Sequence, residues 1–349
     1  MIKPSHIERT ANEPRDPSLR TLTISCITEV TPTIRLLRLD IPPNDSIKFL
    51  PGQWVDLYPP ADANAAKPGG FTITSSPTLA QPSTSSSSPH PNATTTTTRT
   101  RSPDDRGGNR GQQNVQVQHG GYIELAIQAS PPNPAAAYLF RPLCELLYSH
   151  VQVRIGGSFT FPPPSLSDHA NPSLRKIVFV AGGMGINPLM SMLSWLGEQV
   201  VADDDGGGFD IEEVRVLYSV KDPARRTNDD NGHGVVRKGA EILFLERIAE
   251  LFRGSRRLRG GLQLFLTGSN GDTSGDGGDV VRCADGVEVP FLCRRVAVRD
   301  VEEAVGCDKD DAVVYVCGVP AMTDEFVQAL VSPDGFGMDQ KRILFEKWW

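Results

Sequence analysis

The pattern of apolar and polar positions changes character near the middle of the chain. In the first half, short segments with alternating apolar residues are separated by turn-forming residues, which is typical of strands with one buried face. In the second half, continuous apolar runs alternate with helical patterns, as in a parallel sheet that is covered on both faces. The pattern therefore predicts a small antiparallel barrel, which we expect to have six strands, followed by a doubly wound α/β domain.

The expected elements follow this division. In the first half we expect strands at 22–30, 33–39, 49–57, 69–76, 122–127 and 151–159, and one helix at 135–147. In the second half we expect strands at 177–181, 214–220, 262–267, 313–318 and 342–345, and helices at 189–196, 240–252 and 321–330.

The domain boundaries come from shifts in composition. We expect an N-terminal extension at 1–19, the barrel domain at 20–164 and the α/β domain at 172–349, joined by a stiff proline run. The segment 79–118 is rich in Ser, Thr, Pro, Asn and Gly without core-forming periodicity, and we interpret it as a disordered surface insertion. Smaller Gly/Asp-rich insertions are expected at 202–209, 227–238 and 269–280.

Composition excludes several classes of function. The net charge of −7 argues against a nucleic-acid surface, and no apolar run approaches the roughly 20 residues that span a bilayer. The first 20 residues contain no apolar signal segment, and they contain acidic residues that transit peptides usually lack. The six cysteines are scattered without metal-ligand spacing. We therefore expect an intracellular protein with reduced thiols, no metal site and no membrane span.

A glycine-rich turn carries the clearest chemical signal. The apolar strand 177–181 runs into Gly182, Gly183, Met184, Gly185 and Ile186, and is followed by the expected helix cap Asn187 and by Pro188 at the start of a helix. Such a turn lets a phosphate approach backbone N–H groups at a helix N-terminus. A branched side chain at Gly185 would fill the space of a pyrophosphate or require a positive φ. A purely structural turn is the alternative, because the spacing differs from the G-x-G-x-x-G of ordinary dinucleotide folds.

Five separate motifs resemble those of one flavoprotein superfamily. HIERTA at 6–11, PGQWVD at 51–56, GGFTITSSP at 69–77, AGGMGINPL at 181–189 and FEKWW at 345–349 look like the ferredoxin–NADP reductase-like flavoproteins. Within that superfamily they look like the oxidoreductase NAD-binding domain-containing protein 1 family. The resemblance implies FAD on the barrel and NAD(H) or NADP(H) on the α/β domain.

On the flavin side, the resemblance aligns the superfamily's Arg-x-Tyr-Ser/Thr strand with Gly69, Gly70, Phe71 and Thr72, followed by Ile73 and Thr74. Phe71 would lie along the flavin and the Thr72 hydroxyl would approach its reactive nitrogen. The arginine that pairs with the pyrophosphate is missing, and Ala136 stands near the position of a family serine. The alternative is an ordinary strand with one inward aromatic residue.

On the nicotinamide side, Cys317, Gly318, Pro320 and Met322 resemble the family's C-G-x-P-x-M turn. Glu346, Trp348 and Trp349 resemble the E-x-Y-W ending, whose aromatic residues cover the flavin and approach the adenine side. The resemblance thus implies that Thr72, Cys317 and Glu346 meet where hydride is transferred. The alternatives are a buried structural cysteine and a tail that caps the core.

The choice of dinucleotide stays open in the sequence. Asp222 could accept hydrogen bonds from ribose hydroxyls, whereas Arg225 and Arg226 could pair with a 2′-phosphate. The family resemblance alone favours NADH.

We therefore expect a monomeric flavin-dependent NAD(P)H oxidoreductase that passes electrons to a separate, unidentified acceptor. The resemblance implies a mitochondrial location, and a cytoplasmic one is the alternative. A catalytically degenerate nucleotide-binding or interaction protein is the second hypothesis, and the missing arginine and Ala136 favour it.

Overall fold

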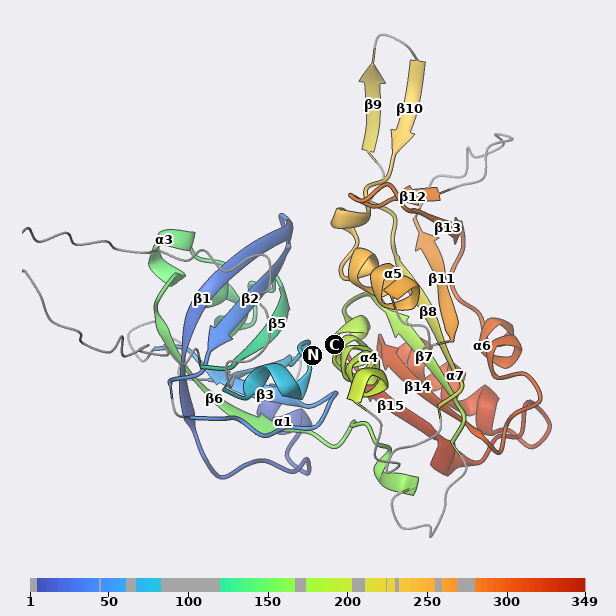
Figure 1. Cartoon of the computed structure of the whole chain (residues 1–349), viewed down its shortest axis with the longest axis horizontal. Coiled ribbons are helices and arrows are strands. Elements are labelled where there is room, and N and C mark those ends of the chain that lie inside the picture. Colours follow the sequence, from blue (N-terminus) through green and yellow to red (C-terminus); the bar gives the residue numbers. More distant parts are fainter. Residues whose placement is uncertain are drawn as a thin grey trace, which may run out of the picture.

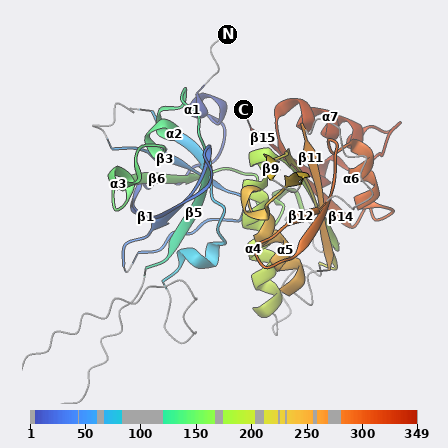
Figure 2. The same cartoon turned by 90° about the horizontal axis from the view of Figure 1, so that it is seen from above.

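A computed structural model gives the fold of the chain. It describes residues 5–43, 45–60, 67–82, 120–166, 174–202, 211–223, 225–229, 232–254, 259–268 and 280–348. Two domains lie side by side, a barrel built from the first half of the chain and a helix-covered sheet built from the second half (Figures 1 and 2). Most of the expected insertion 79–118 lies outside the described residues, apart from a single turn of 3₁₀ helix at Pro77–Ala80.

The barrel domain contains the six expected strands. They are β1 (Arg20–Thr31), β2 (Ile34–Asp40), β3 (Trp54–Tyr58), β4 (Gly69–Thr72), β5 (Tyr122–Gln128) and β6 (His150–Gly156), in the order β4-β3-β6-β1-β2-β5. All pairs are antiparallel, and a bridge between Ile73 and Leu125 joins the two edges of the sheet. Alternate residues such as Leu37 and Leu39 are fully buried inside, as the sequence pattern predicts.

The expected helix at 135–147 is broken into two. The structure has α2 (Pro134–Leu139) and α3 (Leu143–Leu146), with Pro142 between them. Proline lacks the N–H that would continue the helix and disfavours helical angles in the residue before it. The N-terminal segment adds one short helix, α1 (His6–Arg9), whose capping box is formed by Ser5 and Glu8.

The second domain is a seven-stranded sheet. Its parallel part contains β7 (Lys176–Gly182), β8 (Glu213–Lys221), β11 (Gly260–Thr267), β14 (Ala312–Gly318) and β15 (Ile343–Lys347), in the order β11-β8-β7-β14-β15. Helices α4 (Ile186–Ala202) and α5 (Leu245–Gly254) pack in one core cluster, and α6 (Val298–Val305) and α7 (Pro320–Val331) pack in another. The expected doubly wound fold is confirmed. Its topological switch point, between β7 and β14, is where ligands bind in such sheets.

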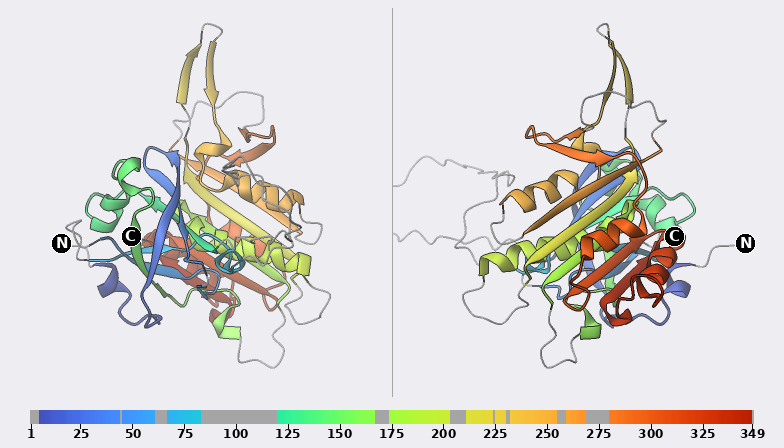
Figure 3. Two further views of the ribbon diagram at one scale, coloured as in Figure 1. Left: turned by 60° about the vertical axis from the view of Figure 1, so that its left-hand side comes forward. Right: turned by 90° about the vertical axis from the view of Figure 1, so that its right-hand side faces the viewer.

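Several elements were not expected from the sequence. β12 (Val280–Arg282) and β13 (Glu288–Leu292) extend one edge of the sheet. The region expected to be a Gly/Asp-rich insertion at 227–238 contains most of a hairpin, β9 (Arg225–Asp229) and β10 (Gly232–Val236), which projects from the domain (Figures 1 and 3).

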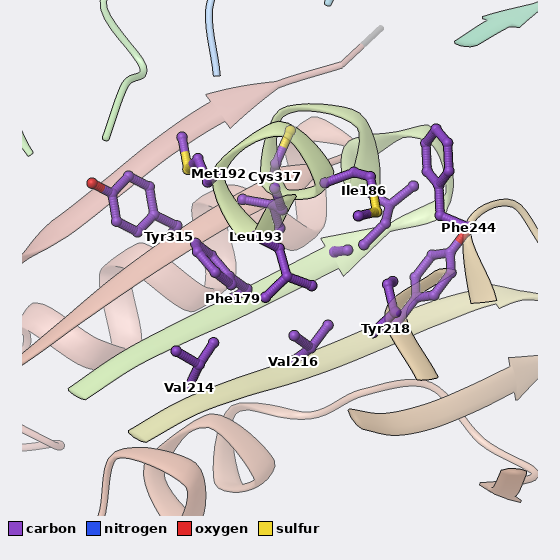
Figure 4. Close-up of a cluster of buried hydrophobic side chains, with 14 of the residues drawn as sticks. Phe179, Ile186, Met192, Leu193, Val214, Val216, Tyr218, Phe244, Tyr315 and Cys317 are labelled. Carbon is purple, nitrogen blue, oxygen red and sulfur yellow. The ribbon is translucent and has the colours of Figure 1, made fainter. Parts of the chain in front are cut away.

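One apolar core crosses the domain boundary. Phe159 and Phe161 of the barrel domain belong to the same cluster as the α4 face of the sheet, and Phe161 packs 5.6 Å from Trp195, measured between ring centroids. Figure 4 shows part of this cluster between α4 and the sheet. The Tyr315 hydroxyl also donates to the Thr160 carbonyl at 2.9 Å, across the boundary. The domains are therefore joined by a packed interface as well as by the linker.

Candidate active site

A cleft of ≈ 1020 Å³ opens between the two domains. It lies at the carboxyl ends of β7 and β14, and its volume is at the upper end of the range for small-molecule sites, about 300–1,000 Å³. Residues from the N-terminal segment, the barrel, the glycine turn and the C-terminal strand line it together. Of the residues singled out in the sequence, those that line it are Gly70, Phe71, Gly182, Gly183, Met184, Asp222, Met322, Glu346 and Trp348.

In the glycine turn, Gly183 leaves a space that a phosphate could fill. It has a φ of +55°, and a Cβ added to it would meet no atom within 4 Å. It also lines the cleft. A backbone turn with no side chain at the N-terminal end of α4 is the arrangement in which N–H groups bind an anion.

The expectation of a positive φ at Gly185 is wrong. Gly185 is not among the residues with positive φ, and a Cβ on it would lie 2.1 Å from the Cys317 carbonyl oxygen. Gly185 is therefore required because the turn packs against the backbone of β14. Its neighbours Ile186 and Asn187 are also buried, and the Asn187 amide donates to the Ala126 carbonyl of the barrel at 3.1 Å. Asn187 thus lies inside α4, where it ties the two domains together, and does not cap the helix as expected.

The C-G-x-P-x-M turn packs against the glycine turn, and of its four motif residues only Met322 lines the cleft. A Cβ on Gly318 would lie 2.5 Å from the Met322 methyl group, so glycine lets Met322 reach the cleft. Pro320 is the first residue of α7, where its missing N–H leaves no hydrogen bond unmade. The Cys317 side chain is fully buried in the core cluster shown in Figure 4. Burial, with a smaller contribution from Glu346, raises the pKa of the Cys317 thiol well above its ordinary value, so it is uncharged at neutral pH.

The C-terminal strand brings Glu346 beside Cys317. The two residues are paired in the β14–β15 register, and the backbone N–H of Trp348 donates to the Gly318 carbonyl at 2.8 Å. The Oε2 atom of Glu346 is buried without a hydrogen-bond partner among the described residues. Burial, reinforced by the charge of Glu13, raises the pKa of Glu346 to about 8. Glu346 therefore holds a proton at neutral pH.

Trp348 packs at the edge of the core and also lines the cleft. It is partly buried against the core cluster, and its side chain lies beside Cys317 and Glu346, where it offsets part of the rise in their pKa values. This position is compatible with both expected roles, a cover for the flavin and a cap on the core. Trp349 lies outside the described residues.

The barrel wall contains the strand that was expected to bind flavin. Phe71 lines the cleft, and the hydroxyl of Thr72 is completely buried with no hydrogen-bond partner in the described part of the chain. An unpartnered buried hydroxyl is costly, and a ligand atom that accepts a hydrogen bond from it would relieve that cost. Thr72 itself is not among the residues that line the cleft. A Cβ on Gly69, however, would lie 2.8 Å from the Cβ of Ala135 and 2.9 Å from the Phe71 ring. There is therefore no room for the family's arginine at this position.

The last two residues of the expected flavin strand point elsewhere. Ile73 is fully buried in the barrel core, and the Thr74 hydroxyl donates to the side chain and backbone of Glu124. The Ala136 N–H donates to the side chain of Asn133, which caps α2 and lines the cleft. The missing serine hydroxyl is therefore not needed to cap this helix.

A buried carboxylate fixes the N-terminal segment against the barrel wall. Asp56 is fully buried on β3, 3.0 Å from His6 Nε2, 3.0 Å from Arg15 Nε and 2.7 Å from Arg154 Nη2. Burial alone would raise the pKa of Asp56, but the contacts with these three residues outweigh it and lower the pKa to about 2. The imidazole of His6 also covers Gly70, where a Cβ would lie 2.1 Å from it. No role was expected for His6 or Asp56 from the sequence.

The candidate ribose-binding residue already has a partner. Both carboxylate oxygens of Asp222 accept hydrogen bonds from Arg237, at 2.9–3.1 Å, and both side chains are almost fully buried. A ribose hydroxyl would have to share these oxygens. Arg225 and Arg226 lie on β9, and their side chains are outside the described part of the structure. Lys221 and Arg295, which the sequence did not single out, line both the cleft and a neighbouring pocket of ≈ 440 Å³.

Metal ligands and membrane spans are not found in the described parts of the chain. No three His, Cys, Asp or Glu side chains there come together as a metal site. None of the helices that the structure describes combines the length and the apolar composition that crossing a bilayer requires. All six cysteines are free thiols.

No family model matches the chain, but it is similar along nearly its whole length to one group of curated proteins. It is 26% identical to oxidoreductase NAD-binding domain-containing protein 1 of Bos taurus, over 99% of this chain and 86% of that protein. It is 25% identical to the human protein of that name, over 99% of this chain and 85% of the relative. The identity to the Danio rerio protein of that name is 26%, over 99% of this chain and 97% of that protein.

Solved structures share the fold at low sequence identity. The ferredoxin NADP⁺ reductase from Neisseria gonorrhoeae with bound FAD and NADP has a TM-score of 0.54 and 13% identity, covering 96% of this chain and all of that one. The structure of the CS-b5R domains of human Ncb5or in the NAD⁺ form has a TM-score of 0.56 and 16% identity, covering 94% of this chain and 69% of that one. These structures confirm the expected two-domain fold, and the similarity to the oxidoreductase NAD-binding domain-containing proteins agrees with the resemblance that the five motifs carry.

Proposed function

We propose that this protein is a flavin-dependent NAD(P)H oxidoreductase that binds FAD on the barrel wall and NAD(H) or NADP(H) at the glycine turn. The observation that carries the proposal is the convergence of Phe71, Gly183 and Glu346 on one cleft between the domains. Relatives of the same fold include a ferredoxin NADP⁺ reductase with FAD and NADP bound in its structure. The two cofactors, when bound, supply the hydride-transfer chemistry.

The residues of this chain would act by binding, orientation and exclusion of water. Phe71 offers an aromatic face in the cleft, and the neighbouring Thr72, which is fully buried and does not line the cleft, has a hydroxyl without a hydrogen-bond partner among the described residues. The Gly183 turn offers backbone N–H groups to a diphosphate. Because its pKa is about 8, Glu346 holds a proton at neutral pH beside the buried Cys317 thiol. The electrons would pass to a separate acceptor.

The second candidate is a nucleotide-binding protein of the same fold without turnover. It is favoured by the lack of space for an arginine at Gly69. The visible absorbance spectrum of the flavin during titration with NAD(P)H distinguishes the two candidates. The purified chain is mixed with FAD, freed of excess flavin and titrated with NADH or NADPH without oxygen.

Loss of the visible flavin absorbance on titration supports the oxidoreductase. A chain that binds NAD(P)H by calorimetry but retains no flavin, or retains a flavin that stays oxidised, supports the second candidate. Glu346→Gln is the matched variant, because it keeps the shape of the side chain and removes the proton that Glu346 can exchange. It should bind both cofactors and reduce flavin more slowly.

A further inference from the structure

We propose that Arg247 of α5 and Glu124 of β5 are positioning residues, which hold the two walls of the cleft at the separation that hydride transfer requires. The inference rests on the proposed function and adds to it two residues that do not line the cleft. Both belong to a set of polar contacts between the domains, which we call the interdomain latch. The residues of the latch are Ser75, Ser76, Thr78, Glu124 and Ala126 on the barrel, and Asn187, Ser191, Glu198 and Arg247 on the nucleotide domain.

Helix α4 carries one half of the latch. It lies with α5 between the barrel and the sheet, so that contacts from both helices reach across the domain boundary (Figures 1 and 2). Asn187 and Ser191 are about one turn apart on α4, and both are fully buried. The Asn187 amide donates to a carbonyl of β5 at 3.1 Å. The Ser191 hydroxyl donates to the Ser75 carbonyl, just beyond β4, at 2.7 Å.

The carboxylate of Glu198 extends these contacts along the same helix. It accepts hydrogen bonds from the hydroxyl groups of Ser76 and Thr78, at 2.5 and 2.6 Å. The segment that follows the expected flavin strand is therefore attached to α4 at several points, and α4 begins at the glycine turn.

An ion pair joins α5 to the barrel. Arg247 donates two hydrogen bonds to the Glu124 carboxylate, at 2.8 Å to Oε1 and 3.0 Å to Oε2. Such a two-point pairing of a guanidinium with a carboxylate fixes orientation as well as distance. The same Oε1 atom accepts from the Thr74 hydroxyl at 2.8 Å, and the Glu124 carbonyl accepts from the Thr74 N–H at 2.8 Å. Arg247 therefore holds both β5 and the segment that continues β4.

Only a few residues of chain connect the latch to the walls of the cleft. On the barrel, Phe71 of the wall is three residues from Thr74. On the nucleotide domain, Leu243 also lines the cleft and is four residues from Arg247. Gly183 of the glycine turn is likewise four residues from Asn187. A displacement at the latch is thus carried to both walls through short stretches of backbone.

The latch can set the separation of the walls because its contacts are directional. The apolar core that the domains share stabilises the interface without fixing one orientation, since the burial of apolar surface is not directional. Hydrogen bonds weaken steeply when donor and acceptor move out of line. Hydride transfer needs the two reacting atoms about 3–3.5 Å apart, and a misplacement of about 1 Å can cost about a hundredfold in rate. A change at Arg247 should therefore alter the rate and leave the binding surfaces intact.

The test uses the full-length protein loaded with FAD, as the wild type, Arg247→Gln, Arg247→Lys, Glu124→Gln and the double variant Glu124→Gln/Arg247→Gln. Arg253→Gln is the matched control, because Arg253 is also an arginine of α5 but pairs with Asp285 of its own domain. Stopped-flow absorbance gives the rate constant of flavin reduction at saturating NADH or NADPH. Flavin fluorescence gives the affinity for FAD, and calorimetry gives the affinity for NAD(P)H.

Arg247→Gln should slow flavin reduction about ten- to a hundredfold and leave both affinities within about twofold. Glu124→Gln should slow it less, because the amide oxygen still accepts one hydrogen bond. The double variant should be no slower than Arg247→Gln, because the two residues act through one contact. Arg247→Lys should recover part of the rate, and Arg253→Gln should react like the wild type.

Three results overturn the inference. One is an unchanged rate of flavin reduction in Arg247→Gln. Another is additive slowing in the double variant, which would mean that the two residues act separately. The third is a loss of cofactor affinity as large as the loss of rate, which would indicate damage to the walls themselves.

Hydrogen–deuterium exchange separates the inference from the proposed function. Arg247→Gln, but not Arg253→Gln, should speed exchange in the barrel segment 71–81 and in α4, and should leave β1 and β2 unchanged. If NAD(P)H fails to reduce the flavin of the wild type, the proposed activity fails, and this pattern of exchange would still support the latch. Unchanged exchange in 71–81 and in α4 would overturn it.

Discussion

The two walls of the cleft are held in place by different forces. The wall on the nucleotide domain is fixed by close contact of backbone with backbone, where Gly185 packs on the Cys317 carbonyl and Gly318 on Gly182. The wall on the barrel is fixed by a buried charge, Asp56, with His6, Arg15 and Arg154 around it. The first wall should therefore be sensitive to added volume and the second to a change of charge.

The largest effect is expected from removing the charge. Asp56→Asn keeps the shape of the side chain but leaves three basic residues around a neutral group, and the loss of one partner from such a buried cluster costs about 3–5 kcal/mol. The free energy of unfolding from urea denaturation measures it. Asp45→Asn is the control, because Asp45 forms an exposed pair with Arg20 and should cost less than about 1 kcal/mol. Equal effects of the two variants would contradict the charged-wall interpretation.

The second effect concerns volume in the glycine turn. In Gly185→Ala the methyl group would collide with the carbonyl of Cys317, and overpacking of this kind costs about 1–3 kcal/mol. In Gly183→Ala the methyl group meets open space, so the fold loses only the roughly 1–2 kcal/mol of a left-handed backbone. The methyl group would, however, stand where we place the dinucleotide phosphates.

Urea denaturation and calorimetric titration with NAD(P)H on both variants distinguish the two glycines. Gly185→Ala should lose more stability, and Gly183→Ala should lose more affinity. The reverse order would place the phosphate site at Gly185.

The third effect is the pH dependence of stability that comes from Glu346. Its pKa is about 8 in the folded protein and near the ordinary 4.5 in the unfolded chain. Between these values the unfolded chain releases a proton that the folded protein keeps, so this group lowers the free energy of unfolding as the pH rises from 4.5 to 8. Glu346→Gln should remove that decline.

Thermal midpoints of both proteins measured across this range test it, and the two profiles should differ most near pH 8. Parallel profiles would show that Glu346 titrates normally.

The contribution of Asp56 to the free energy of unfolding depends on pH in the opposite direction. Its lowered pKa stabilises the fold above pH 3.8, and this contribution is lost as the pH falls through about 2.

The smallest effect concerns the choice of dinucleotide. Because Arg237 occupies both oxygens of Asp222, the cations Lys221 and Arg295 are better placed to meet a 2′-phosphate than Asp222 is to bind a ribose. Lys221→Gln should lower the affinity for NADPH up to about fivefold, the value of an exposed charge contact, and leave NADH unchanged. Lys341→Gln is the control, since Lys341 does not line either cavity. If both variants bind NADPH like the wild type, Lys221 is not part of the site.

The same comparison explains what could be predicted from the sequence. The wall on the nucleotide domain is local in the chain, because a strand, a turn and a helix follow one another from 176 to 202. Its glycines and its place at the end of a buried strand were therefore predictable. The reason for Gly185 was not, because its close neighbour Cys317 lies 132 residues further on.

The barrel wall is assembled from distant segments. Asp56 gathers residues from positions 6, 15 and 154, and no local pattern in the sequence indicates such a cluster. The motifs HIERTA and PGQWVD contain His6, Arg9, Trp54 and Asp56, but the resemblance gave these residues no role. A charged residue inside the predicted strand 49–57 was the available signal, since an unpaired carboxylate is rarely fully buried.

The shared apolar core has a consequence for how the molecule unfolds. Ala126, Phe159 and Phe161 of the barrel domain and Leu166 of the linker belong to a cluster whose other buried members lie in the second domain, so melting of either domain would expose apolar side chains of the other. We therefore expect one cooperative heat-absorption peak, with equal calorimetric and van't Hoff enthalpies, where a loosely linked pair of domains would give two. A barrel expressed alone would expose Phe161 to water and should aggregate, so the cleft is best studied in the intact chain.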